Sequence, residues 1–150
     1  MSNELRVMVV EDNEFDMTVI TSALDAAGID YKAVSDSREV LQVAIEYKPS
    51  IAILDIQMPE FNGKQVREQL LTRPETSHIK VIFLSASDSA EDVLYGLNLH
   101  FSGYFKKGVQ IGHVIDSVMA IDCVTNIRKS INEYSHISQR IANKYLALSH

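Results

Sequence analysis

The chain has 150 residues, of which 46% are apolar and 23% charged, and its formal net charge is −6. This length suits one domain with a substantial core and is short for two domains. The acidic balance argues against non-specific nucleic-acid binding, which needs clustered cations. The single cysteine excludes an intrachain disulfide and a thiolate metal cluster, and it suits a reducing compartment.

No stretch approaches the roughly 18 apolar residues of a membrane span. The first residues lack the apolar core of a signal peptide. We therefore expect a cytoplasmic protein without a membrane partner.

Five short apolar segments recur along the chain and are bounded by turn residues. They are Leu5–Val10, Ala33–Val34, Ile51–Leu54, Val81–Leu84 and Gly103–Phe105. Continuous apolar runs of this length predict strands that are buried on both faces, as in parallel sheets.

Segments with helical spacing lie between and after these runs. They are Phe15–Ala27, Ser37–Tyr47, Gly63–Leu71, Ser89–Leu99 and a segment that begins near Gln110. Phe15 is expected on the apolar face of the first helix with Ile20 and Leu24, and Ser37 is the expected N-cap of the second. The alternation predicts an α/β fold, a doubly wound five-stranded parallel sheet that ends near residue 121.

Chemically active side chains follow four of the five predicted strands. They are Glu11 and Asp12 after the first, Asp55 after the third, Ser85 after the fourth, and Lys106 and Lys107 after the fifth. Because ligands of open α/β sheets bind at the carboxyl ends of the strands, we expect these side chains to form one site.

This set of residue types indicates phosphoryl chemistry. Three neighbouring carboxylates repel one another unless a cation binds, and oxygen-only ligands suit Mg²⁺. A carboxylate beside Mg²⁺ can attack phosphorus, while a lysine and a hydroxyl hold the phosphoryl oxygens. Each residue alone is explained by a turn, a helix cap or surface charge; only the ordered combination favours a site.

Over residues 5 to about 121, the chain resembles the receiver domain (CheY-like) of bacterial two-component response regulators. The matching pieces are Val9–Asp12, Ile53–Pro59 with Gly63, Leu84–Ala86 and Gly103–Lys107. The resemblance implies the strand order 2-1-3-4-5. It also implies a phosphorylation-dependent switch, rather than an enzyme, that receives its phosphoryl group from a histidine kinase or phosphotransfer protein.

The resemblance also implies the metal ligands and the phosphorylation site. Asp55 matches the phosphorylated residue. Mg²⁺ would be bound by Asp12, Asp55 and the backbone carbonyl of Gln57, with Glu11 acting through water.

Three further residues match family positions that respond to the phosphoryl group. Ser85 and Lys107 match the residues that contact it, since the spacing from Tyr104 selects Lys107 over Lys106. Tyr104 matches the aromatic residue that turns inward on activation.

Two features depart from the family pattern. Gly108 stands where the family usually has proline, which predicts a looser or differently shaped loop. His100 and Phe101 are bulky where the family usually has small residues, and this predicts an altered surface beside the fifth strand.

Residues 122–150 form a predicted helical extension of the receiver domain in residues 1–121. Their apolar residues fall mostly at spacings of three and four: Val124, Ile127, Ile131, Tyr134, Ile141, Tyr145 and Leu148, with Ile137 one residue off. Three interpretations remain open: the extension covers its own domain, pairs two chains as a homodimer, or links to an output domain outside this chain. No direct nucleic-acid binding is expected. The alternative function is a phosphorylation-independent scaffold that dimerises through this helix.

Overall fold

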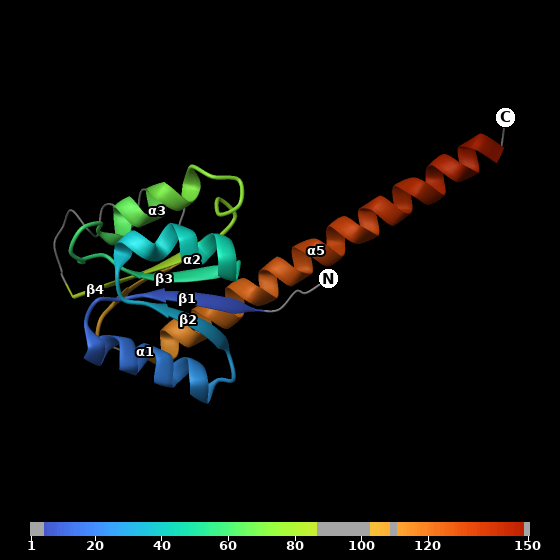
Figure 1. Ribbon diagram of the computed structural model, residues 1–150. Coiled ribbons are helices and arrows are strands. Elements are labelled where there is room, and N and C mark those ends of the chain that lie inside the picture. Colours follow the sequence, from blue (N-terminus) through green and yellow to red (C-terminus); the bar gives the residue numbers. More distant parts are fainter. Residues whose placement is uncertain (1–4, 87–102, 109–110, 149–150) are drawn as a thin grey trace.

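The strands of the computed structural model form one parallel sheet in the order β2-β1-β3-β4-β5 (Figure 1). The structure describes residues 5–86, 103–108 and 111–148. The strands are β1 (Arg6–Val10), β2 (Asp30–Val34), β3 (Ile51–Asp55), β4 (Lys80–Ser85) and β5 (Gly103–Lys106). The predicted fold class and strand order are confirmed.

Helices cover both faces of the sheet (Figure 1). They are α1 (Glu14–Ala26), α2 (Val40–Tyr47), α3 (Gly63–Leu71) and α5 (Ile111–Leu148), and a 3₁₀ turn (Ser37–Glu39) leads into α2. α1 and α5 pack on one face, and α2 and α3 pack on the other. The helix predicted over Ser89–Leu99 and the bulky pair His100 and Phe101 lie outside the described residues.

The central strands hold the core because both of their faces are covered. Along β1, Met8 and Val10 join the cluster on the α2/α3 side, whereas Val7 and Val9 join the cluster on the α1/α5 side. This alternation follows the two-residue period of a strand. Burying each large apolar side chain contributes about 1.5–3 kcal/mol, so the sheet supports itself without the acidic residues at its edge.

Two local predictions were wrong. Phe15 is 76% exposed, because it is nine residues from the buried Leu24 and therefore lies on the opposite side of α1, whereas Met17 in the same turn packs against the core. Ser37 is not a cap; the side chain of Asp36, one residue earlier, accepts a 2.9 Å hydrogen bond from the Arg38 amide. The Ser37 hydroxyl instead donates to the Pro59 carbonyl (3.0 Å) and accepts from the Phe61 amide (3.1 Å), which ties down the loop after β3.

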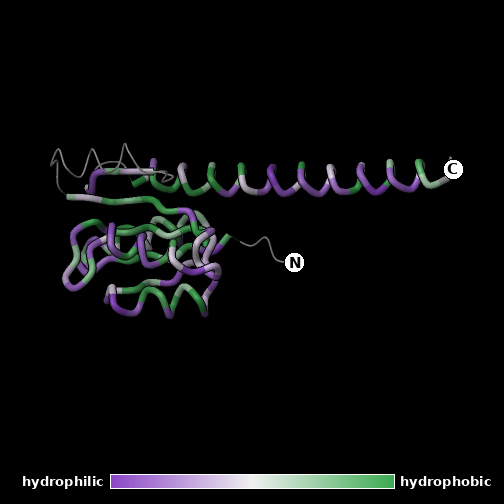
Figure 2. The backbone as a smooth tube through the Cα atoms, turned by 90° about the horizontal axis from the view of Figure 1, so that it is seen from above, coloured by the Kyte–Doolittle hydropathy of each residue, from purple (hydrophilic) through white to green (hydrophobic). Residues whose placement is uncertain are grey.

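The helix α5 is continuous from the body into the extension. Its first turns bury Val114 and Val118 against the sheet, and then the helix leaves the body (Figure 1). Every described side chain from 127 to 147 is exposed, so the interpretation that the extension covers its own domain is wrong. Apolar positions recur along the projecting part (Figure 2). Within the described residues, no helix is both long and apolar enough for a membrane crossing.

Candidate functional site

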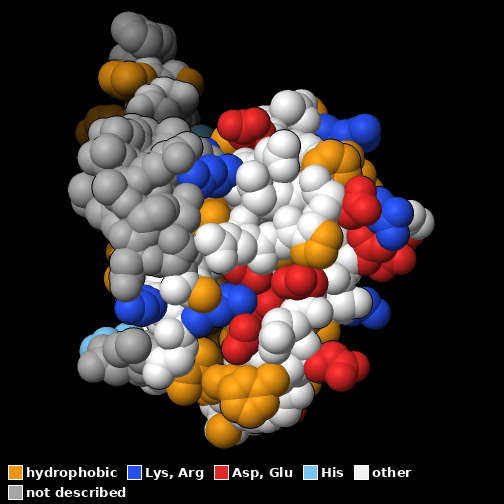
Figure 3. Space-filling model, turned by 90° about the vertical axis from the view of Figure 1, so that its left-hand side faces the viewer, with side chains coloured by type: hydrophobic (Ala, Val, Ile, Leu, Met, Phe, Trp, Pro, Cys, Tyr) orange, Lys and Arg blue, Asp and Glu red, His pale blue; other side chains and the backbone are white. Residues whose placement is uncertain are grey.

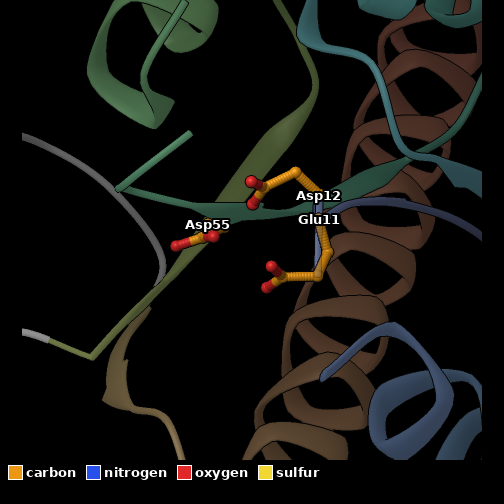
Figure 4. A group of neighbouring side chains, drawn as sticks. All are labelled: Glu11, Asp12 and Asp55. Atoms are coloured by element: carbon orange, nitrogen blue, oxygen red, sulfur yellow. The ribbon is translucent and has the colours of Figure 1, made fainter. Parts of the chain in front are cut away.

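Three carboxylates meet where β1 and β3 end. The side chains of Glu11, Asp12 and Asp55 point toward a shared space (Figure 4), with carboxylate oxygens within 4.8 Å of one another. Glu11 is 1% exposed and Asp55 2%, whereas Asp12 is exposed to solvent. On the space-filling surface, acidic side chains gather at the centre of this edge, with cationic ones beside them (Figure 3).

The backbone at the ends of the strands determines this meeting. β1 and β3 pair in register up to Val10 and Leu54. The next residues, Glu11 and Asp55, therefore emerge at the same edge of the sheet. The amide of Gln57 donates to Asp55 Oδ1 at 3.0 Å and orients that carboxylate. The amide of Asn13 similarly donates to Glu11 Oε1 at 3.1 Å. Both buried carboxylates are therefore held by the turn that follows their strand.

Gly63 lets α3 begin directly against the backbone of Asp55. A Cβ atom at Gly63 would lie 2.5 Å from the Asp55 carbonyl oxygen, a distance that no side chain tolerates without movement. The Gly63 amide donates to the Ile56 carbonyl at 2.9 Å. Asn62 and Gln65 form a capping box that begins the helix at this point. The sequence Asn62-Gly63 thus fixes the loop that carries Asp55.

Lys107 lies among the carboxylates. Its Nζ is 2.9 Å from Asp55 Oδ2, 2.8 Å from Glu11 Oε2 and 3.1 Å from Asp16 Oδ2. The Lys107 amide also donates to the Ser85 carbonyl at 2.8 Å, which aligns the turn after β5 with β4. The structure therefore brings Lys107, as the sequence indicated, into the acidic group.

Asp16 is a member of the site that sequence reasoning missed. It lies in the first turn of α1, four residues after Asp12. Asp12 precedes the N-cap Asn13, so helical spacing does not relate the two carboxylates, and the contact of Asp16 with Lys107 depends on how α1 is placed beside the turn after β5.

The pKa values of Glu11 and Lys107 are shifted because both groups are buried beside other charged side chains. Burial raises the pKa of Glu11 to about 7; Lys107 opposes this rise and Asp55 reinforces it. Burial lowers the pKa of Lys107, but its hydrogen bonds to Glu11, Asp55 and Asp16 outweigh burial and raise the pKa above its usual value. One ammonium group thus contacts three carboxylates, and a fourth, Asp12, lies beside Glu11 and Asp55. The remaining negative charge and the all-oxygen donor set fit a hard divalent cation.

The other predicted residues lie at the ends of neighbouring strands. Ser85 is fully buried at the end of β4, one residue beyond the strand partner of Asp55. Tyr104 on β5 is half-buried, packs against the core on the α2/α3 side, and has a buried hydroxyl. Gly108 has a φ of 78°, which proline, with φ near −65°, cannot adopt. The loop therefore has a shape that the usual proline of the family would not permit.

Comparisons with known proteins agree with this geometry. The response regulator receiver domain family matches residues 7–119. The Escherichia coli transcriptional regulatory protein HprR is 32% identical over 116 residues, which are 77% of this chain and 51% of HprR. The Brucella anthropi polar-differentiation response regulator DivK is 36% identical over 80 residues, 53% of this chain and 65% of DivK.

Solved structures show the same fold. The receiver domain of the Francisella response regulator 1452 superposes with a TM-score of 0.73 at 25% identity, covering 81% of this chain and 99% of that one. The chain spans about half the length of HprR. With its receiver topology and the acidic group of Glu11, Asp12 and Asp55 at the carboxyl edge of the sheet, the chain belongs to the response regulator receiver family.

Proposed function

We propose that the chain is a phosphorylation-dependent switch that accepts a phosphoryl group on Asp55. The observation that carries this proposal is the convergence of Asp12, Glu11 and Lys107 on the buried carboxylate of Asp55. Oδ1 of Asp55 is oriented by an amide and Oδ2 by an ammonium, so the nucleophile is held before a donor arrives. Such preorganisation lowers the cost of reaching the transition state.

In the proposed reaction, an Asp55 carboxylate oxygen forms a bond to phosphorus while the donor's phosphorus–nitrogen bond breaks. The leaving imidazole of the donor histidine takes up a proton. Asp12, Asp55 and the Gln57 carbonyl would hold Mg²⁺, with Glu11 acting through water. Receiver domains bind Mg²⁺ at such an acidic site, and the ion supplies the positive charge that neutralises the incoming phosphoryl oxygens.

Ser85 and Lys107 are proposed to contact the phosphoryl group once it is attached. Lys107 is already 2.9 Å from Asp55 Oδ2, so a modest movement transfers its hydrogen bonds from carboxylates to phosphoryl oxygens. Tyr104 on β5 is the residue whose packing is proposed to change when Asp55 is phosphorylated. The added charge would thereby bias the surface formed by β5 and its flanking elements.

The proposed donor is a histidine kinase or phosphotransfer protein, the partners with which receiver domains interact. Phe15 and Val19 on α1 are 76% and 39% exposed, and Phe15 lies one residue from Asp16 of the site. Apolar side chains beside an acidic pocket support docking of a donor helix over Asp55. We expect this exchange to take place in the cytoplasm, because a single cysteine suits a reducing compartment.

Intact mass spectrometry tests the proposal. The chain is incubated with acetyl phosphate and Mg²⁺, and the same is done with Asp55→Asn and with the exposed control Asp116→Asn. One added phosphoryl group is expected in the wild type and in Asp116→Asn, and none in Asp55→Asn or in EDTA. A folded wild type that gains no mass under these conditions would instead support the phosphorylation-independent scaffold.

We further propose that residues 1–121 form the receiver domain and that residues 122–150 pair two chains. Within the projecting part of α5, Ile127, Ile131 and Ile141 are 53%, 57% and 65% exposed and recur at helical spacing. An apolar stripe exposed on an isolated helix is stabilised when a second helix covers it. HprR, a transcriptional regulatory protein about twice as long as the matched region, supports the alternative that α5 also leads to an output domain.

Cysteine cross-linking tests the pairing. Val124→Cys in a Cys123→Ser background is expected to form a disulfide-linked dimer if two helices run parallel. If they run antiparallel, only a mixture of Val124→Cys and Leu148→Cys cross-links. If sedimentation shows that the chain stays monomeric at high micromolar concentration, pairing is excluded and α5 is better explained as a linker to an output domain.

A further inference from the structure

A cavity of about 770 Å³ lies at the amino edge of the sheet, opposite the acidic group. Its walls are the first residues of β1, β3 and β4, the end of α2, and the part of α5 from Ile121 to Asn132. This is the point where α5 leaves the body (Figure 1). The volume falls within the range of about 300–1,000 Å³ that is typical of small-molecule sites.

The lining of this cavity is basic although the chain is acidic overall. Its five cations are Arg6, Lys48, Lys80, Arg128 and Lys129, against two carboxylates, Glu75 and Asp122. The side chains of Lys48, Lys80 and Arg128 form no hydrogen bond or ion pair with other described residues. Positive charge that the protein does not neutralise is available to an anion.

The charge lies on the side of α5 that faces the body. Thr125, Arg128 and Asn132 continue, at spacings of three and four, the helix face on which Val118 is buried. The apolar stripe lies on the other side, since Ile127 is nine residues from Val118 and about 100° separates successive residues. A dimer formed through the stripe would therefore leave the basic cavity open.

We propose that this cavity binds a small phosphate-bearing ligand that bridges the sheet body and the root of α5. Guanidinium and ammonium groups donate several hydrogen bonds to phosphate oxygens, and Ser50, Thr125 and Asn126 add neutral polar groups. Bound there, the ligand fixes the direction in which the extension leaves the body. This site is separate from Asp55 and does not depend on phosphoryl transfer.

The surroundings favour a small anion over a nucleic acid. Beyond Asn132, the described part of α5 carries only Arg140 and Lys144 as lysine or arginine residues, along with Glu133. Nucleic-acid binding needs a continuous basic track, and the net charge of −6 repels a long polyanion. The phosphate source, inorganic or nucleotide, is distinguished by the choice of probe.

Isothermal titration calorimetry in EDTA tests the proposal, with inorganic pyrophosphate and ATP as probes. The double variant Lys80→Ala/Arg128→Ala is expected to bind about 100-fold more weakly, because each lost hydrogen bond to a charged group weakens binding about tenfold or more. Arg140→Ala, on the same helix but outside the cavity, is expected to bind like the wild type. Tighter binding of ATP than of pyrophosphate would indicate a nucleotide, and equal binding would indicate the phosphate group alone.

Three results would overturn the proposal. The first is that neither probe binds the wild-type chain at millimolar concentration. The second is that the double variant binds the probes as tightly as the wild type does. The third is that a single-stranded oligonucleotide binds and that Arg140→Ala weakens its binding as much as Arg128→Ala does, which would indicate a nucleic-acid surface. Lys80 and Arg128 are exposed, so the variants are expected to fold, which circular dichroism checks. Probe-induced shifts of the Thr125, Asn126 and Asn132 amides in NMR spectra provide an independent location of the site.

Discussion

The sheet body and the projecting part of α5 both carry apolar side chains at regular spacing, but they place them differently relative to water. In the body, alternate residues such as Val9 and Val10 are buried on opposite faces of the sheet. In the projecting helix, Ile131 is 57% exposed and Tyr145 73% exposed. Spacing thus determines which side chains share a face, whereas the neighbouring element determines whether that face is core or interface.

The largest expected difference between the two regions concerns stability. Phe83 is fully buried in β4, so Phe83→Ala is expected to lower the free energy of unfolding by about 3–5 kcal/mol. Tyr145→Ala removes an aromatic ring from the exposed helix and is expected to change it by less than about 0.5 kcal/mol at low protein concentration. Urea denaturation followed by circular dichroism measures both. Equal losses would mean that the helix is part of the cooperative body.

The sequence predicted the sheet and the acidic group because continuous apolar runs and the residues at their ends are local signals, whereas the strand order came from the resemblance to the receiver family. The selection of Lys107 over Lys106 depended on family spacing, and the structure brings Lys107 Nζ to within 2.9 Å of Asp55 Oδ2. Asp16 was missed because its role depends on where α1 begins relative to β5, which is a tertiary relation.

Local predictions failed where two neighbouring residues compete for a cap and where an apolar residue was assigned to the wrong side of a helix. Asp36 and Ser37 are both good caps, and the chain uses the earlier one because a 3₁₀ turn precedes α2. Phe15 is nine residues from the buried Leu24, so it lies on the opposite side of α1 and does not share the buried face. The basic cavity had no sequence signal, because Arg6, Lys80 and Arg128 are far apart in the chain.

The second expected effect concerns the charge balance of the acidic group. Lys107→Ala in EDTA is expected to cost about 2 kcal/mol of unfolding free energy, because hydrogen bonds from a charged donor are lost. Adding Mg²⁺ is expected to restore much of this loss, since a second cation replaces the ammonium group. Thermal unfolding with and without Mg²⁺ measures the effect, and Lys106→Ala is the matched control.

The pH dependence of this loss has a defined sign. The pKa of Glu11 is raised from 4.5 to about 7, so stability from this group is fully present below pH 4.5 and falls as the pH rises toward 7. Lys107 opposes that rise, and its removal raises the pKa of Glu11 further. The deficit of Lys107→Ala is therefore expected to be larger at pH 8 than at pH 6; a deficit that shrinks with pH would contradict the assigned contact.

A third effect, of comparable size, is expected at Gly63, where α3 contacts the backbone of Asp55. Gly63→Ala would place a Cβ atom 2.5 Å from the Asp55 carbonyl oxygen and force α3 away from β3. Overpacking of this kind costs about 1–3 kcal/mol. The same displacement is expected to slow phosphorylation by acetyl phosphate. Gly112→Ala, which has open space around its Cβ position, is the control and is expected to be neutral or slightly stabilising.

The smallest effect on stability is expected from a change in the projecting helix that has a large effect on assembly. Ile131→Asp is expected to change the unfolding free energy of the dilute monomer by less than about 0.5 kcal/mol, because Ile131 is exposed. In a paired helix, the same carboxylate would be buried without a partner, so sedimentation should show dissociation at concentrations where the wild type associates. Asn143→Asp, on the side of α5 opposite the apolar stripe, provides the control. If Ile131→Asp unfolds the monomer instead, the exposed stripe already contacts the body, and the distinction between core and interface on α5 fails.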